Sequence, residues 1–207
     1  MENLLNFYKS EEEQLNKHLL KVKKTLRIIS ILRLVVFILT IGGIYLLFDN
    51  TLLASASLII GGSSFYYLVA RYSKKKTEKE LLGCKIQINQ AEIKVQNGNF
   101  SFLPTGKEFI NSNHDFSHDI DLFGAKSFFQ YLNRTSTIDG RDKLANLMTE
   151  NHTSTIDQKQ EAIKELSEKV KWRQHFSALS SMVKTEISSK KIVGFFQSYQ
   201  GVFSKKV

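Results

Sequence analysis

The sequence predicts a mainly all-α protein, in which a two-helix transmembrane hairpin precedes a mostly helical region with a short irregular or β segment near 98–122. Three observations predict this fold. Residues 28–70 carry almost no charge, although 24% of the 207 residues are charged. Pro104 is the only proline, which suits long uninterrupted helices. Apolar residues recur at helical spacing on both sides of the uncharged stretch.

The N-terminal segment, residues 1–27, is predicted to form a cytoplasmic amphipathic helix. Ser10 and Glu13 have the spacing of a capping box, in which each side chain satisfies an open backbone amide. Apolar residues then follow at helical spacing, at Leu15, Leu19, Val22 and Leu26. No helix breaker separates this segment from the first apolar stretch.

Residues 28–72 are predicted to form the transmembrane hairpin, with spans at about 28–48 and 52–70. Roughly twenty apolar residues in a helix rise about 30 Å, the thickness of the hydrocarbon core of a bilayer. The tight turn at 49–51 makes the two spans antiparallel, so both termini lie on one side. Arg33 is the charged exception in the first span, where its long side chain can snorkel to the headgroups.

Basic residues flank both spans, and they account for much of the net charge of +9 without nucleic acid. They are Lys17, Lys21, Lys23, Lys24 and Arg27 before the first span, and Arg71, Lys74, Lys75 and Lys76 after the second. The positive-inside rule therefore predicts a multi-pass protein of the inner or plasma membrane with both termini cytoplasmic. Cys84 is the only cysteine, so no intrachain disulfide can form, which fits a reduced compartment.

Each span carries a glycine pair, Gly42–Gly43 in the first and Gly61–Gly62 in the second. Small residues let two helix backbones approach closely in lipid. Glycine is also simply common in membrane helices, so the sequence leaves both explanations open.

Residues 73–97 are predicted to form a polar connecting helix, which ends at the break 97–99. Residues 98–207 follow as a helical region. Within it, the turn at 104–106 precedes an aromatic cluster that we expect in a core: Phe123, Phe128, Phe129, Tyr131 and Leu132. Residues 135–140 read as a break before a short helix at 141–149.

Two further helices are predicted towards the C-terminus. Thr155 and Gln158 have capping-box spacing and open a helix whose apolar face holds Ile156, Ile163, Leu166 and Val170. Residues 192–203 are predicted to belong to the second of these helices. We expect Trp172 to be buried between solvated basic neighbours, although a basic segment around an aromatic residue can also meet nucleic acid.

Two polar motifs are candidates for a metal site or a phosphate-binding loop, and neither has the pattern that such a site requires. His114 and His118 have the spacing of a helical metal site, but the residues before them favour a loop, where that spacing does not converge. Residues 104–108 lack the first glycine and the hydroxyl residue of a phosphate loop. We therefore predict no catalytic, cofactor-binding or metal-binding residue, and no enzyme activity of this chain itself.

Three ordered blocks lie between Phe109 and Leu179: residues 119–124, 127–141 and 158–166. They combine a strand-like segment, a helix ending in a hydroxyl-rich turn, Thr-x-x-Gly, a short helix and a long one. In this order they resemble the start of the core region of the MutS-like DNA mismatch-repair ATPases. The family-motif residues are Asp119, Asp121, Phe123, Gly124, Asn133, Arg134, Thr135, Thr137, Gly140 and Gln160.

The resemblance implies the membrane-anchoring and core segment of a MutS-related ATPase, which would couple an ATPase domain beyond this sequence to DNA or partner binding. It implies ATP and Mg for that missing domain, a homodimer of the full-length protein, and DNA as a partner beside the lipid bilayer. The sequence departs from the family by carrying a hairpin where soluble members carry a mismatch-reading domain, and by ending before any ATPase. The alternative is a membrane-anchored helical scaffold that binds protein partners without DNA or nucleotide.

Overall fold

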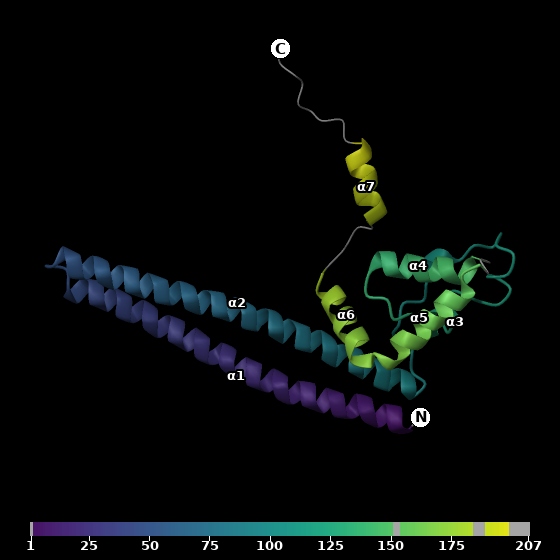
Figure 1. Cartoon of the computed structure of the whole chain (residues 1–207), viewed down its shortest axis with the longest axis horizontal. Coiled ribbons are helices and arrows are strands. Elements are labelled where there is room, and N and C mark those ends of the chain that lie inside the picture. Colours follow the sequence, from purple (N-terminus) through teal and green to yellow (C-terminus); the bar gives the residue numbers. More distant parts are fainter. Residues whose placement is uncertain (1, 151–153, 184–188, 199–207) are drawn as a thin grey trace, which may run out of the picture. The chain divides into compact units, whose positions relative to one another are not determined.

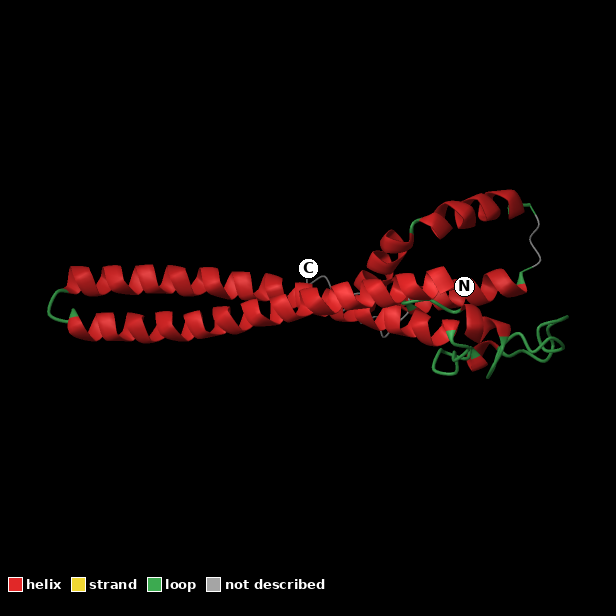
Figure 2. Ribbon diagram, turned by 90° about the horizontal axis from the view of Figure 1, so that it is seen from below, coloured by secondary structure: helices red, strands yellow, loops and turns green. Residues whose placement is uncertain are grey.

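The computed structural model describes residues 2–150, 154–183 and 189–198. These ranges contain seven α-helices, one short 3-10 helix and no strand (Figure 2). The mainly all-α prediction is therefore confirmed. The chain divides into two compact units, residues 1–90 and 91–207, and the boundary falls inside the second helix.

The first unit is a hairpin of two long helices, α1 (Glu2–Leu46) and α2 (Thr51–Gln96), which lie side by side (Figure 1). Their 45 and 46 residues correspond to lengths of about 68 Å at 1.5 Å per residue. The connection is the predicted tight turn. Asn50 closes it, because its Oδ1 accepts hydrogen bonds from the backbone N–H groups of Leu52 and Leu53 at the open start of α2.

The start of α1 differs from the sequence prediction, whereas the end of α2 agrees with it. The capping box at Ser10 is wrong, because α1 already begins at Glu2 and the Ser10 hydroxyl donates to the carbonyl of Phe7 inside the helix. A capping side chain needs an amide that the helix leaves open, and the body of a helix offers none. The predicted break after α2 is confirmed, with Gly98 at a φ of +81°.

Each long helix has an apolar stretch and a polar flank, and the two flanks pair with each other. We call residues 28–48 with 52–70 the apolar arm, and residues 2–27 with 73–90 the polar arm. Within the polar arm, Val22, Leu26 and Leu82 form a buried cluster. Gln90 Nε2 also donates to Glu12 Oε1 of the facing helix at 2.7 Å. The N-terminal and connecting helical segments expected from the sequence are thus continuous with the two apolar stretches, and they pair with each other.

The second unit begins with turns and continues with short helices. Its elements are the 3-10 helix η1 (Lys107–Phe109) and the helices α3 (Phe128–Leu132), α4 (Ile138–Thr149), α5 (Ile156–Glu168), α6 (Val170–Met182) and α7 (Ser189–Ser198). Residues 98–122 are irregular apart from η1, so the β alternative for this segment is wrong. The break predicted at 135–140 is shorter than expected, since α4 begins at Ile138. The end of the helix predicted at 192–203 lies outside the described residues.

A small aromatic core organises the start of the second unit. Leu122, Phe123, Phe129 and Ala145 are buried together. Gly106 has a φ of +67°, and a Cβ at this position would lie 2.6 Å from the Phe129 ring, so this turn requires glycine. The motif at 104–108 is therefore a turn packed on the core.

Several aromatic residues that we predicted to be buried are exposed. Phe128 is 58% exposed, because α3 has only five residues and its inward face is occupied by Phe129. Tyr131 and Leu132 are exposed as well. Trp172 is 55% exposed and stacks on Phe176, with ring centroids 5.4 Å apart, so its assignment to a core is also wrong.

The neighbours Phe128 and Phe129 provide a matched test of this core. Phe129→Ala removes a fully buried ring and is expected to cost about 3–5 kcal/mol of stability. Phe128→Ala is expected to change stability by no more than about 0.5 kcal/mol. Hydrogen–deuterium exchange over residues 122–148 of the full chain measures both, and equal protection in the two variants would contradict the assignment.

Candidate functional site

The apolar arm exposes its hydrophobic side chains almost everywhere. Only 6% of the most apolar window of α1 is buried, and 0% of that of α2. Both helices are long and apolar enough to cross a membrane. Core helices of soluble proteins bury such windows, and soluble monomers rarely expose apolar patches of this extent. The arm therefore exposes an apolar surface that a soluble monomer rarely carries.

Two glycines allow the helices of the apolar arm to approach closely. A Cβ at Gly61 would lie 2.0 Å from Thr40 Oγ1, and a Cβ at Gly43 would lie 2.6 Å from Ser57 Oγ. Gly42 and Gly62 have open space at the same position. Gly61 is thus required by helix packing, because three side-chain atoms of Thr40 lie within 2.8 Å of the added Cβ, whereas the Ser57 hydroxyl facing Gly43 can turn away.

Arg33 lies between the two helices of the apolar arm. Its guanidinium carbon is 5.3 Å from the centroid of the Phe65 ring and 5.5 Å from that of the Tyr72 ring. Such cation–π contacts strengthen when water is excluded. The Nε atom is buried and has no hydrogen-bond partner among the described residues. Two aromatic rings of α2 therefore stabilise the charge of Arg33, in addition to any stabilisation from its side chain reaching the headgroups.

A charged cluster joins the two helices of the polar arm. Glu78 of α2 accepts from His18 Nε2 of α1 at 3.2 Å and from Lys75 Nζ at 2.6 Å. The hydrogen bond from Lys75 holds the pKa of Glu78 below its usual value, the charge of His18 adds to this, and partial burial opposes it. The Glu78 carboxylate is thus a link between the helices in its ionised form.

The first group of motif residues builds a turn at the edge of the aromatic core. Phe123 is 7% exposed. Gly124 has a φ of +115° and donates its backbone N–H to the carbonyl of Thr105 at 2.8 Å. Asp121 has a φ of +48°, and both Asp119 and Asp121 are exposed. The conformations of Asp121 and Gly124 favour the residue types that occupy them.

The second group follows α3. Asn133 is buried, and its Oδ1 accepts from the backbone N–H of Thr135 at 3.0 Å and from its hydroxyl at 2.7 Å. Arg134 forms a fork with Glu92, in which Nε is 2.6 Å from Oε1 and Nη2 is 3.4 Å from Oε2. This geometry makes the contact specific for arginine.

The third group starts α4. Thr137 is its N-cap, and its hydroxyl accepts from the backbone N–H of Gly140 at 3.1 Å. A Cβ at Gly140 would lie 3.0 Å from this hydroxyl, which explains the Thr-x-x-Gly spacing as a tight cap. Gln160 is exposed on α5 and does not join the other motif residues.

Gln130 belongs to the same block, and no sequence pattern indicated its role. Its Nε2 donates to the carbonyls of Leu103 at 2.6 Å and Ser101 at 3.1 Å, and its Oε1 accepts from the backbone N–H of Lys126. It is 1% exposed, so it satisfies the backbone of an irregular segment inside the unit.

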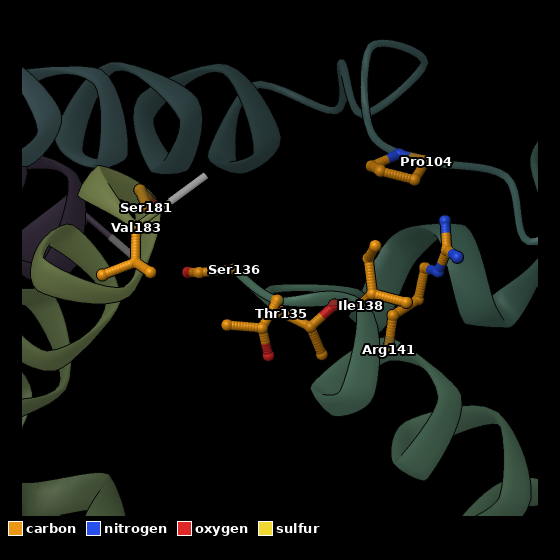
Figure 3. A pocket seen from close by; sticks show the side chains of 8 residues that line it. Pro104, Thr135, Ser136, Ile138, Arg141, Ser181 and Val183 are labelled. Carbon is orange, nitrogen blue, oxygen red and sulfur yellow. The ribbon is translucent and has the colours of Figure 1, made fainter. Parts of the chain in front are cut away.

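An open pocket lies beside the start of α4, as Figure 3 shows. It is lined by Pro104, Thr135, Ser136, Thr137, Ile138, Arg141, Ser181 and Val183. Its one cation, Arg141, is paired with Glu108 at 2.8 Å. The Thr137 hydroxyl is used by the cap. The lining groups are thus mostly engaged with their own chain.

The two histidines lie in turns. Nδ1 of His114 accepts from the backbone N–H groups of Phe116 at 3.5 Å and Ser117 at 3.3 Å, so this imidazole caps a turn. Across the described ranges, no group of three or more His, Cys, Asp or Glu side chains is placed to hold a metal ion.

Comparison of the chain with protein-family models, with curated proteins and with solved structures found no match.

The glycine pair of α2 allows a matched test of helix packing. Gly61→Leu overpacks the contact with Thr40 and is expected to cost about 1–3 kcal/mol. Gly62→Leu adds the same side chain into open space, and its stability is expected to match that of the wild type. Thermal unfolding of the helical circular dichroism in mild detergent measures both, and equal midpoints for the two variants would refute the close contact.

The polar arm is expected to lose stability in acid. Because the folded pKa of Glu78 is lowered from 4.5, its contribution is complete above that pH and disappears as the pH falls through the folded pKa. The effect is expected to stay below about 1 kcal/mol. Hydrogen exchange of residues 10–27 between pH 6 and pH 3 measures it. Glu78→Gln should reduce this pH dependence to the part that Glu13 contributes through its ion pair with Lys17, whereas the remote Glu165→Gln should preserve it in full.

Proposed function

We propose that the apolar arm anchors the chain in an inner or plasma membrane as a two-span hairpin, with both termini cytoplasmic. The observation that carries this is the exposure of the apolar surface of both helices. Each span has about the length that a hydrocarbon core of roughly 30 Å requires. Basic residues flank the apolar arm on both helices, and the positive-inside rule assigns such flanks to the cytoplasmic side.

We propose further that the second unit is the start of a MutS-like core, so that the chain is the membrane-anchoring and core part of a MutS-related protein. The ordered blocks of the sequence support this proposal. Their residues also have the physical roles that such a block needs: Gly124 in a turn, Asn133 holding Thr135, and Thr137 capping α4. In this function the hairpin tethers a helical core that couples a downstream ATPase to DNA or a partner.

A membrane-anchored scaffold for protein partners is the second candidate. It is favoured by the exposed apolar residues of α5 and α6, above all the stacked pair Trp172 and Phe176. Exposed aromatic residues of this kind are enriched in protein interfaces.

Native Cys84 tests the membrane topology. It lies in the polar arm and is partly exposed. A membrane-impermeant maleimide should label it in inside-out vesicles and leave it unlabelled in intact cells. Asp49→Cys in a Cys84→Ser background, at the opposite end of the hairpin, should give the reverse pattern. Labelling of Cys84 in intact cells, or a folded chain that stays soluble without detergent, would overturn the proposed anchor.

The complete reading frame tests the MutS-related core. A strand followed by GxxxxGK[ST] is expected downstream of residue 207, because phosphate binding at a helix start needs that loop. A complete gene without it would defeat the proposal.

DNA binding separates the two candidate functions. If the core contacts phosphates, duplex binding by the full chain in detergent should weaken steeply with salt, with a slope of about −0.9 per phosphate contacted. Binding of duplex with no dependence on salt would argue against phosphate contact. Absence of binding at low salt together with capture of a protein partner at α6 would favour the scaffold.

A further inference from the structure

One flank of the apolar arm is hollowed between the two helices. Leu32 and Val36 of α1 and Ser63, Ser64, Tyr67 and Leu68 of α2 line this groove. These six positions are three apolar residues, two small serines and one tyrosine, with Tyr67 and Leu68 nearest the polar arm on α2. Arg71 lies one turn further on, and its Nη1 donates to Tyr67 Oη at 3.3 Å. The cation of Arg71 therefore lies just beyond one end of the groove, next to its Tyr67, and the groove continues from there along an apolar wall.

We infer that this groove binds one anionic phospholipid, with the phosphate at Arg71 and an acyl chain along Leu32, Val36 and Ser64. The inference deepens the membrane location proposed above and rests on it. A groove on a membrane span is filled by an acyl chain or by another helix, because hydrocarbon leaves no water to occupy it.

The dimensions fit an acyl chain. Ser63 and Arg71 are eight residues apart, which is about 12 Å along the helix axis. One leaflet of the hydrocarbon core is about 15 Å thick. The groove is therefore long enough to contact most of one acyl chain, starting at the level of the headgroup.

The charges favour a lipid over a second copy of the hairpin. Residues 21–33 and 71–76 contain nine basic residues and no acidic residue. Two parallel hairpins packed through this flank would bring these cations together, and Arg71 would be desolvated beside like charge. An anionic headgroup instead offers the opposite charge, and each basic residue near such a surface contributes about 1 kcal/mol.

Arg33 adds to the same preference. It is adjacent to Leu32 in the sequence, and the rings of Phe65 and Tyr72 hold its charge within the membrane-facing region. Residues 28–48, 52–70 and 71–76 carry no acidic side chain, and the nearby Asp49 lies at the far turn. The positive charge beside the groove therefore needs a counter-ion, and an anionic lipid supplies one.

Native mass spectrometry of the full chain, released from nanodiscs of equal phosphatidylglycerol and phosphatidylcholine, tests the inference. The wild type should retain one phosphatidylglycerol in preference to phosphatidylcholine. Arg71→Gln should reduce this preference by about fivefold, the equivalent of one cation. The matched control Lys24→Gln removes the same charge from an exposed position on α1 and should have a smaller effect.

A second pair of variants tests the groove itself. Ser64→Leu fills it and should abolish retention of both lipids, whereas Gly62→Leu adds the same bulk where nothing lies within 4 Å and should retain phosphatidylglycerol. Equal loss in Arg71→Gln and Lys24→Gln, or equal retention in Ser64→Leu and Gly62→Leu, would overturn the site while leaving the anchor intact. Failure of the wild type to enter nanodiscs would overturn the anchor itself.

Discussion

The antiparallel packing of α1 on α2 is the constraint on which the first unit depends. It brings the helices into close contact at Gly61, where any side chain would collide with Thr40, and at Gly43, which faces the hydroxyl of Ser57. Such backbone proximity adds dispersion contacts between the two helices. Once the turn at Asn50 sets the register, the same pairing continues into the polar arm, where burial of Val22, Leu26 and Leu82 adds a hydrophobic contribution.

Charged side chains are stabilised by different partners in the two arms. In the polar arm, Glu78 meets Lys75 and His18 in water, where screening makes each contact small. In the apolar arm, Arg33 has aromatic faces instead of a carboxylate. A buried ion pair would require two desolvated charges, whereas a ring face costs little to desolvate and still attracts a cation.

In the second unit, short-range hydrogen bonds replace regular structure. Thr137 caps α4, Asn133 holds the following Thr135, and Gln130 satisfies two carbonyls of the irregular segment. Helices as short as α3 are marginal by themselves, so such caps together with the Phe129 core determine their positions.

The sequence by itself determined the two apolar spans, the turn between them and the breaks at Gly98 and Gly106, because length, hydropathy and glycine conformation act locally. It also located the motif around Thr137. Only the tertiary structure decided that the polar flanks pair, which glycine of each pair faces its partner, and that Trp172 and Phe128 are exposed. These features depend on which neighbouring element packs against each helix face. A periodic pattern shows which residues share a face, but it does not show what packs against that face.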